Sequence, residues 1–270
     1  MSGKDGTKEK DGMKGCVGRD GMKEKKVRGS VRAFSGVLKQ WVQHFLQLWF
    51  PPCCAACDRP LVENERFICL ECQYHLPITN FHVDSFNEGV QLIGGQFPLD
   101  FVACFLRFEE RSRVQNIVHQ FKYFGNKQLG FSLGQSYGNL LKKNQHPCLS
   151  SDALIPIPAQ GTTKKKRGYN QSQVFAEGLA TELNLPIISD VLYKLPSVES
   201  QVGKGRAARF DNLEQAYQCI ENEGRLQGKK VILVDDVLTT GATISSCANA
   251  LFMQGVTSVG VIALARKRNR

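Results

Sequence analysis

The spacing of hydrophobic residues predicts a helix near the start of the chain. Apolar side chains recur three and four positions apart over residues 34–49, with polar residues between them, and prolines follow at positions 51 and 52. This period is typical of an amphipathic helix, and proline cannot continue one. We therefore expect a helix that ends before Pro51.

From residue 101 onward the pattern changes to alternating strands and helices. Short apolar runs predict strands at residues 101–108, 154–158, 231–234 and 259–265, the last followed by a basic tail at 266–270. Helical periodicity lies between them, at residues 114–121, 174–183 and 244–253. Because such alternation forms a parallel sheet with helices on its faces, the expected fold class is α/β.

These patterns divide the chain into four segments. A basic extension, expected to be disordered, precedes a helix with a compact cysteine segment, then a glycine-containing connector and the α/β domain. Their bounds are 1–32, 33–78, 79–100 and 101–268.

Composition and charge exclude several classes of protein. Hydrophobic residues make up 42% and charged residues 22% of the chain, as in ordinary globular proteins. No run approaches the ~18 apolar residues that a transmembrane helix needs, and no secretory signal is visible, so we expect a cytoplasmic protein. The net charge is +10, of which residues 1–39 contribute +6. That arm reads either as a solvated extension or as an electrostatic handle for nucleic acid.

Four cysteines have the spacing of a metal site. Cys54 and Cys57 are separated by two residues, eleven residues follow, and Cys69 and Cys72 repeat the pair. Two such pairs supply the four thiolates that tetrahedral Zn²⁺ prefers, so we predict a structural zinc knuckle. Cys53 leaves the register of the first pair open, since it could stand in for Cys54.

The strand at residues 231–234 leads into a stretch suited to a sugar phosphate. Asp235 and Asp236 follow the strand, and a loop then enters the next helix. The loop residues are Thr239, Thr240, Gly241, Ala242 and Thr243. Backbone N–H groups at a helix N-terminus bind anions, and Gly241 permits the positive φ or the close backbone approach that such a site needs.

The two carboxylates beside this loop limit the ligand further. Alone they would repel a bare phosphate. They fit a ligand whose sugar hydroxyls they bind, or a Mg²⁺ ion that bridges to phosphate. The residue types at 235–243 therefore predict a ribose phosphate held at both its sugar and its phosphate.

This stretch resembles the signature of type I phosphoribosyltransferases, and further motifs resemble the ComF family, also called GntX-like. Those motifs are the knuckle, Phe121-Lys122-Tyr123 with Gly125, Ile155-Pro-Ile-Pro158, Lys164-Lys-Lys-Arg-Gly-Tyr-Asn-Gln171, and Gln201 with Arg206, Arg209 and Asn212. The resemblance implies a type I phosphoribosyltransferase-like parallel sheet, flanked by helices and preceded by a small zinc knuckle. It also implies phosphoribosyl pyrophosphate as ligand, with Mg²⁺.

Roles carry over residue by residue from that resemblance. Asp235 and Asp236 would bind the ribose hydroxyls, and the loop at 239–243 would bind the 5′-phosphate. Four cations become candidates for contacting the pyrophosphate or closing over the ligand. They are Arg167, Lys122, Arg206 and Arg209. No catalytic base for an acceptor is evident.

Two functions follow from the family resemblance, and the sequence leaves both open. One is an enzyme of the pentosyl glycosyltransferase class, which would transfer the phosphoribosyl group to an unidentified acceptor. The other is a protein without catalysis that binds single-stranded DNA and uses the phosphoribosyl pyrophosphate site as a sensor. ComF membership implies a link to DNA uptake in natural transformation, with DNA-uptake proteins as partners.

Overall fold

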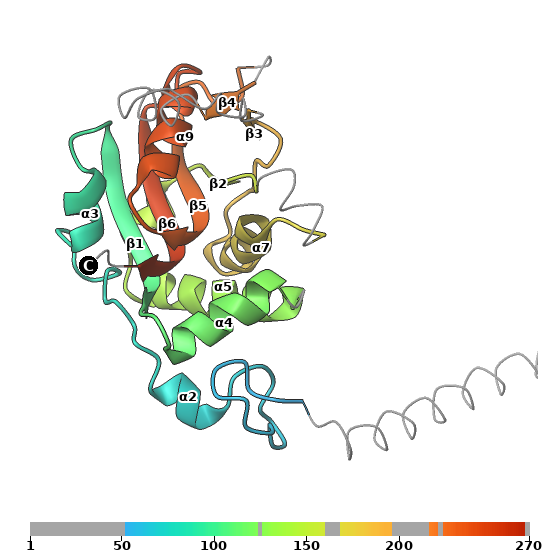
Figure 1. Cartoon of the computed structure of the whole chain (residues 1–270). Coiled ribbons are helices and arrows are strands. Elements are labelled where there is room, and N and C mark those ends of the chain that lie inside the picture. The colour runs from blue at the N-terminus through green and yellow to red at the C-terminus, as the bar shows by residue number, and fades with distance from the viewer. Residues whose placement is uncertain (1–51, 124–125, 160–167, 196–215, 221–223, 268–270) are drawn as a thin grey trace, which may run out of the picture. The chain divides into compact units, whose positions relative to one another are not determined.

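A computed structural model describes residues 52–123, 126–159, 168–195, 216–220 and 224–267 (Figure 1). The basic extension, the predicted helix at 34–49 and the segments that carry Arg167, Arg206 and Arg209 lie outside these residues. Of two compact units, the second begins at Pro52 and contains everything described below.

A four-stranded parallel sheet forms the centre of this unit, in the order β1-β6-β5-β2 (Figure 1). The strands are β1 (Leu99–Phe108), β2 (Ala153–Pro156), β5 (Lys230–Leu238) and β6 (Ser258–Lys267). Strands β5 and β6 lie in the middle, and their central residues, 231–234 and 259–265, are buried and carry no charge, as expected for a sheet covered on both faces. The predicted α/β class is therefore confirmed.

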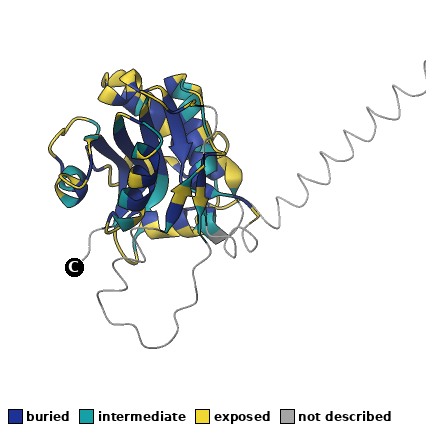
Figure 2. Cartoon of the chain, turned by 90° about the horizontal axis from the view of Figure 1, so that it is seen from above, coloured by how far each residue is buried: buried dark blue, intermediate teal, exposed yellow. Residues whose placement is uncertain are grey.

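Helices cover both faces of the sheet and enclose two buried clusters (Figure 2). One face packs against α4 (Arg113–Tyr123), α5 (Lys127–Lys143) and α7 (Gln171–Leu183). The other packs against α3 (Glu88–Ile93) and α9 (Ala242–Phe252). Alternate residues of β5 serve opposite faces, with Ile232 and Val234 in the first cluster and Val231 and Leu233 in the second.

Two glycines let α5 and α7 approach closely. A Cβ built on Gly134 of α5 would lie 2.3 Å from the carbonyl oxygen of Phe175, and one on Gly178 of α7 would lie 2.1 Å from that of Phe131. Only residues without a side chain fit at this crossing. The contact fixes α7, whose first turn carries residues of the site described below.

The structure differs from the sequence prediction in several elements. Helix α5 was not predicted, nor was the antiparallel hairpin of β3 (Leu192–Lys194) and β4 (Tyr217–Cys219). Strand β5 does not end at the acidic pair but continues to Leu238. Strand β6 runs to Lys267, so Arg266 belongs to the strand and not to a basic tail.

Short elements complete the described chain. Helix α2 (Leu70–Tyr74) lies in the cysteine segment, and a 3₁₀ turn (Pro147–Ser150) precedes β2. The predicted connector at 79–100 carries α3, and its Phe81 and Phe97 are buried in the second cluster. Within the described residues, no helix has the length and apolar character needed to cross a membrane.

Candidate functional site

Two carboxylates, Asp235 and Asp236, lie near the carboxyl end of β5; we call them the acidic pair. The Asp235 carboxylate is half-buried and accepts from the backbone N–H of Asp236 at 2.8 Å and from the hydroxyl of Ser172 at 3.4 Å. Ser172 belongs to the first turn of α7. Parallel sheets bind ligands at the carboxyl ends of their strands, which is where the acidic pair stands.

Lys122, in the last turn of α4, pairs directly with this site. Its Nζ lies 2.8 Å from Oδ2 of Asp236, and the two side chains are 20% and 18% exposed. An ion pair so well shielded is stronger than an ordinary surface pair. The structure thus places Lys122, a predicted pyrophosphate candidate, against the acidic pair.

The pKa of Asp235 is raised to about 7, first by burial and then by the charge of Asp236. The N–H of Asp236, Lys122 and Ser172 act in the opposite direction but do not cancel the rise. The folded protein therefore holds a proton on Asp235 that the unfolded chain releases near its ordinary pKa of 3.8. Asp235 therefore lowers the free energy of unfolding progressively as the pH rises from 3.8 to about 7. Above about pH 7 the loss of stability is complete.

We expect Asp235→Asn to raise the melting temperature by a few °C at pH 8 and by much less at pH 4.5. The asparagine oxygen can still accept from Ser172 and the backbone, while the buried charge is gone. Differential scanning calorimetry of both proteins at the two pH values measures this. Asp152→Asn, at an exposed aspartate, is the control. A gain that is equal at both pH values would contradict the raised pKa.

Residues 239–243, here the threonine–glycine loop, comprise the turn after β5 and the first two residues of α9. Gly241 caps the helix in the left-handed region with φ 86°, so the positive φ predicted for it is confirmed. A Cβ at this position would also lie 2.1 Å from Cγ2 of Ile93, so no other residue fits. The turn leaves Thr239, Thr240 and Thr243 exposed beside the N-terminus of α9, where backbone N–H groups favour an anion.

The acidic pair and the threonine–glycine loop meet at one cavity of about 330 Å³. Asp235, Asp236 and Thr243 line it together with the first turn of α7 and the residues that follow β2. Asn170 at the start of α7 also donates to the carbonyl oxygen of Ile157, which ties these two segments together at 3.0 Å. The size lies within the usual range for small-molecule sites, about 300–1,000 Å³.

The β3–β4 hairpin adds two cavity residues that sequence reasoning missed, Lys194 and Tyr217. The Lys194 ammonium lies 5.3 Å from the centre of the Tyr217 ring, and burial lowers its pKa. Burial raises the pKa of Tyr217, with smaller contributions from Cys247 and the acidic pair. No sequence signal pointed to them, because strands of three residues are too short to show a period.

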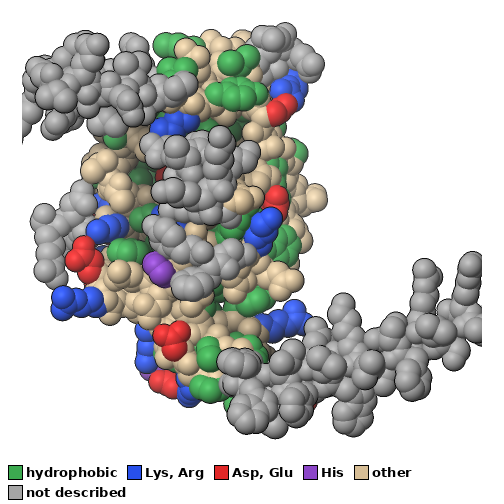
Figure 3. Space-filling model, turned by 45° about the vertical axis from the view of Figure 1, so that its right-hand side comes forward, with side chains coloured by type: hydrophobic (Ala, Val, Ile, Leu, Met, Phe, Trp, Pro, Cys, Tyr) green, Lys and Arg blue, Asp and Glu red, His purple; other side chains and the backbone are tan. Residues whose placement is uncertain are grey.

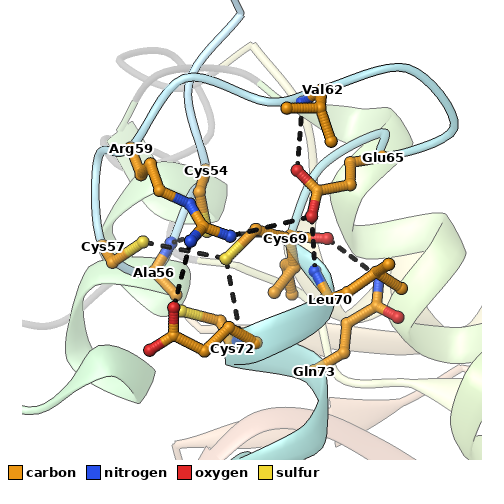
Figure 4. Close-up of polar contacts among 12 residues, drawn as sticks. Cys54, Ala56, Cys57, Arg59, Val62, Glu65, Cys69, Leu70, Cys72 and Gln73 are labelled. Carbon is orange, nitrogen blue, oxygen red and sulfur yellow. Dashed lines mark hydrogen bonds and ion pairs between the residues drawn. The ribbon is translucent and has the colours of Figure 1, made fainter.

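The cysteine segment, residues 53–77, forms a second site, here called the knuckle (Figure 4). The sulfurs of Cys54, Cys57, Cys69 and Cys72 all lie within 4.8 Å of one another, and those of Cys57 and Cys69 are 3.8 Å apart. Four sulfurs at the corners of a tetrahedron with Zn–S bonds of about 2.3 Å would be roughly 3.8 Å apart. The cluster could therefore hold one zinc ion.

Backbone hydrogen bonds and burial show that Cys54, and not Cys53, belongs to the cluster. The sulfur of Cys54 accepts from the N–H groups of Ala56 at 3.4 Å and Cys69 at 3.3 Å, as a thiolate ligand would. Cys53 is exposed and lies outside the cluster. His75, three residues after Cys72 and also able to bind zinc, lies outside the cluster as well. The first cysteine of the cluster is therefore Cys54 and not Cys53.

The knuckle packs on the α/β domain. Ala55, Ala56 and Ile68 belong to the same buried cluster as α4 and α5. The side chain of Asn116 in α4 donates to the carbonyl oxygen of Ala56 at 2.9 Å, and Arg113 lies 3.5 Å from Glu71. Loss of the knuckle would therefore expose part of the domain core.

Comparison with known proteins gives matches to part of the chain. Residues 152–270, from β2 to the C-terminus, match the phosphoribosyl transferase domain family. A hypoxanthine phosphoribosyltransferase from Staphylococcus aureus shares 16% identity over 54% of this chain and 69% of that one, with a TM-score of 0.34. The matched region and the parallel sheet define a protein with a phosphoribosyltransferase domain.

Three curated relatives narrow the class. Competence protein F of Haemophilus influenzae is 30% identical over 46% of this chain and 54% of its own length, so the alignment spans about half of that relative. DNA utilization protein YhgH of Shigella flexneri is 25% identical over 79% of this chain and 89% of its own length. Competence protein ComFC of Bacillus subtilis is 32% identical over 53% of this chain and 55% of its own length. The names of these relatives, together with the matched domain, support a ComF family protein.

Proposed function

We propose that this protein binds phosphoribosyl pyrophosphate with Mg²⁺ in the cavity at the end of β5 and transfers its phosphoribosyl group to an acceptor. The observation that carries the proposal is that Asp235, Asp236 and Thr243 line one cavity at the N-terminus of α9. The acidic pair suits the ribose hydroxyls, and the threonine–glycine loop suits the 5′-phosphate. The family domain over residues 152–270 supports this assignment.

Lys122 fits the same proposal as a counterion. In the free protein it neutralises Asp236 at 2.8 Å, which keeps two adjacent carboxylates compatible with a nearby anion. Mg²⁺, when bound with the ligand, would supply further positive charge for the departing pyrophosphate. In the transfer, the bond from ribose C1 to the pyrophosphate oxygen breaks with its electron pair on pyrophosphate. The acceptor nucleophile forms the new bond to C1 and releases its proton.

The segments that carry Arg167, Arg206 and Arg209 join the described chain beside the cavity. Residues 160–167 connect Ala159 to the start of α7, and residues 196–215 connect the strands that carry Lys194 and Tyr217. Ala159, Asn170, Lys194 and Tyr217 all line the cavity. This connectivity supports the proposal that these arginines reach the pyrophosphate.

Titration of the zinc-loaded full chain with phosphoribosyl pyrophosphate, with and without added Mg²⁺, tests the binding. We expect a dissociation constant in the micromolar range with Mg²⁺ and much weaker binding without it. Mg²⁺ is omitted and not chelated, so that the knuckle keeps its metal. Release of pyrophosphate on addition of candidate acceptors then tests the transfer. Absence of binding with Mg²⁺ present would contradict the proposal.

We also propose that the knuckle holds one structural Zn²⁺. Four thiolates fill a tetrahedral coordination shell and leave no position for water or substrate. The proximity of the sulfurs of Cys54, Cys57, Cys69 and Cys72 supports this role. The metal would contribute folding energy to a segment with little core of its own.

A second function, binding of single-stranded DNA in DNA uptake, is favoured by the relatives named for competence and DNA utilization. On the face drawn in Figure 3, the described basic and acidic side chains are interspersed. The basic arm at 1–39, with its net charge of +6, is the source of DNA affinity in this proposal. In this role the sugar-phosphate site would act as a sensor.

Binding of a fluorescent single-stranded oligonucleotide by the full chain measures this second function. We expect the affinity to fall at least about tenfold between 50 and 200 mM salt, because each phosphate contact releases counterions. Affinity that does not change with salt would argue against an electrostatic DNA interface.

A further inference from the structure

A buried arginine holds the start of the threonine–glycine loop. Arg266 lies on β6 in register with Leu238 of β5, and only 6% of it is exposed. Its Nη1 donates to the carbonyl oxygens of Leu238 at 3.2 Å and Thr239 at 2.8 Å, and also to that of Lys267. The contact therefore falls where the strand becomes the loop.

These two hydrogen bonds orient the N–H groups of the loop. In a trans peptide unit the C=O and the N–H point in opposite directions. With the Leu238 and Thr239 carbonyls turned toward Arg266, the N–H groups of Thr239 and Thr240 are turned away from it. Arg266 thus fixes the direction of two backbone donors in the loop that precedes α9.

The charge of Arg266 lacks a counterion in the described part of the chain. No carboxylate of those residues lies within ion-pair distance of it, and its buried Nε has no hydrogen-bond partner there. A buried cation is costly unless an anion is near. A buried, unpaired charge next to a helix N-terminus points to an anionic ligand.

We propose that Arg266 is the positioning residue of a site for a phosphate monoester dianion at the threonine–glycine loop. It orients the Thr239 and Thr240 N–H groups toward the phosphate and supplies the positive charge that the dianion offsets. The inference deepens the proposed function and rests on it for the identity of the ligand, the 5′-phosphate of a ribose.

Titration of the full chain with two probes tests this role: ribose 5-phosphate alone, and pyrophosphate with Mg²⁺. We expect Arg266→Met to lower the affinity for ribose 5-phosphate about 10- to 100-fold, the usual effect of losing hydrogen bonds to a charged group. The affinity of Arg266→Met for pyrophosphate with Mg²⁺ should stay within about threefold of the wild-type value, because this probe is expected to bind away from the loop. Lys267→Met, which removes the neighbouring charge that pairs with Glu110 at 3.1 Å, is the matched control and should change neither.

Arg266→Lys separates positioning from folding. It keeps the charge and one donor, so ribose 5-phosphate should bind more tightly than to Arg266→Met and less tightly than to the wild type. If Arg266→Met does not fold, a three- to tenfold loss in Arg266→Lys, roughly 1 kcal/mol, with pyrophosphate unchanged supports the role.

Equal affinities for ribose 5-phosphate in the wild type and the folded Arg266 variants would overturn the inference. So would a parallel loss of both probes, which would mean a purely structural role. Wild-type protein that binds ribose 5-phosphate but not phosphoribosyl pyrophosphate would contradict the proposed function and keep the phosphate site. Wild-type protein that binds neither would contradict both.

Discussion

Replacement of one knuckle cysteine, Cys72→Ser, is expected to remove zinc from the protein and to unfold the knuckle. A three-thiolate site loses most of its affinity, and a structural zinc contributes roughly 10–16 kcal/mol of binding free energy in small knuckles. Cys72 is fully buried, so the serine hydroxyl also leaves an unmatched polar group in the core. Cys53→Ser, at an exposed cysteine outside the cluster, should behave like the wild type.

The loss should extend into the α/β domain. Ala55, Ala56 and Ile68 share a buried cluster with α4 and α5, and their departure would expose apolar surface there. We expect one zinc per wild-type chain by metal analysis, almost none in Cys72→Ser, and a melting temperature lowered by several °C. Purified wild-type protein without zinc, or a Cys72→Ser variant that keeps a full equivalent, would rule out the structural metal.

Much of this fold follows from local sequence signals. The apolar run at 231–234 predicted a buried strand, and it lies in a central strand of the sheet. The two cysteine pairs predicted a cluster that the structure confirms, because a two-residue spacing turns both sulfurs to one side. Gly241 was predictable as a left-handed residue because the turn into α9 requires positive φ.

Other features depend on contacts between distant residues, which no local pattern reports. Helix α5 contains three glycines that lower its helix propensity, and it forms because Gly134 and Gly178 let it pack on α7. The β3–β4 hairpin is only three residues on each side, too short for a periodic signal. Arg266 looked like part of a basic tail because its burial depends on the loop that it holds.

The candidate site shows the same division. The acidic pair and the threonine–glycine loop are contiguous in sequence and were found together. Lys122 was singled out, but its partner Asp236 lies 114 positions away, and only the fold brings them to 2.8 Å. Lys194 and Tyr217 lie at the cavity through a hairpin that the sequence did not reveal.

The second large effect is expected at the acidic pair. The double variant Asp235→Asn/Asp236→Asn should weaken phosphoribosyl pyrophosphate by at least about 100-fold, because hydrogen bonds from hydroxyls to charged groups contribute about 1.5–3 kcal/mol each. Asparagine keeps the shape of both side chains and an oxygen that can accept from Ser172 and the backbone, so the fold should persist. Lys122 loses its ion-pair partner, and a melting curve checks the effect of that loss.

Calorimetric titration of the wild type, the double variant and the exposed control Asp152→Asn with phosphoribosyl pyrophosphate and Mg²⁺ tests the central claim most directly. The wild type and the control should bind with the same micromolar constant, and the folded double variant should give no measurable heat at the same concentrations. Equal binding by all three proteins, or no binding by the wild type, would contradict a sugar-phosphate site at Asp235 and Asp236.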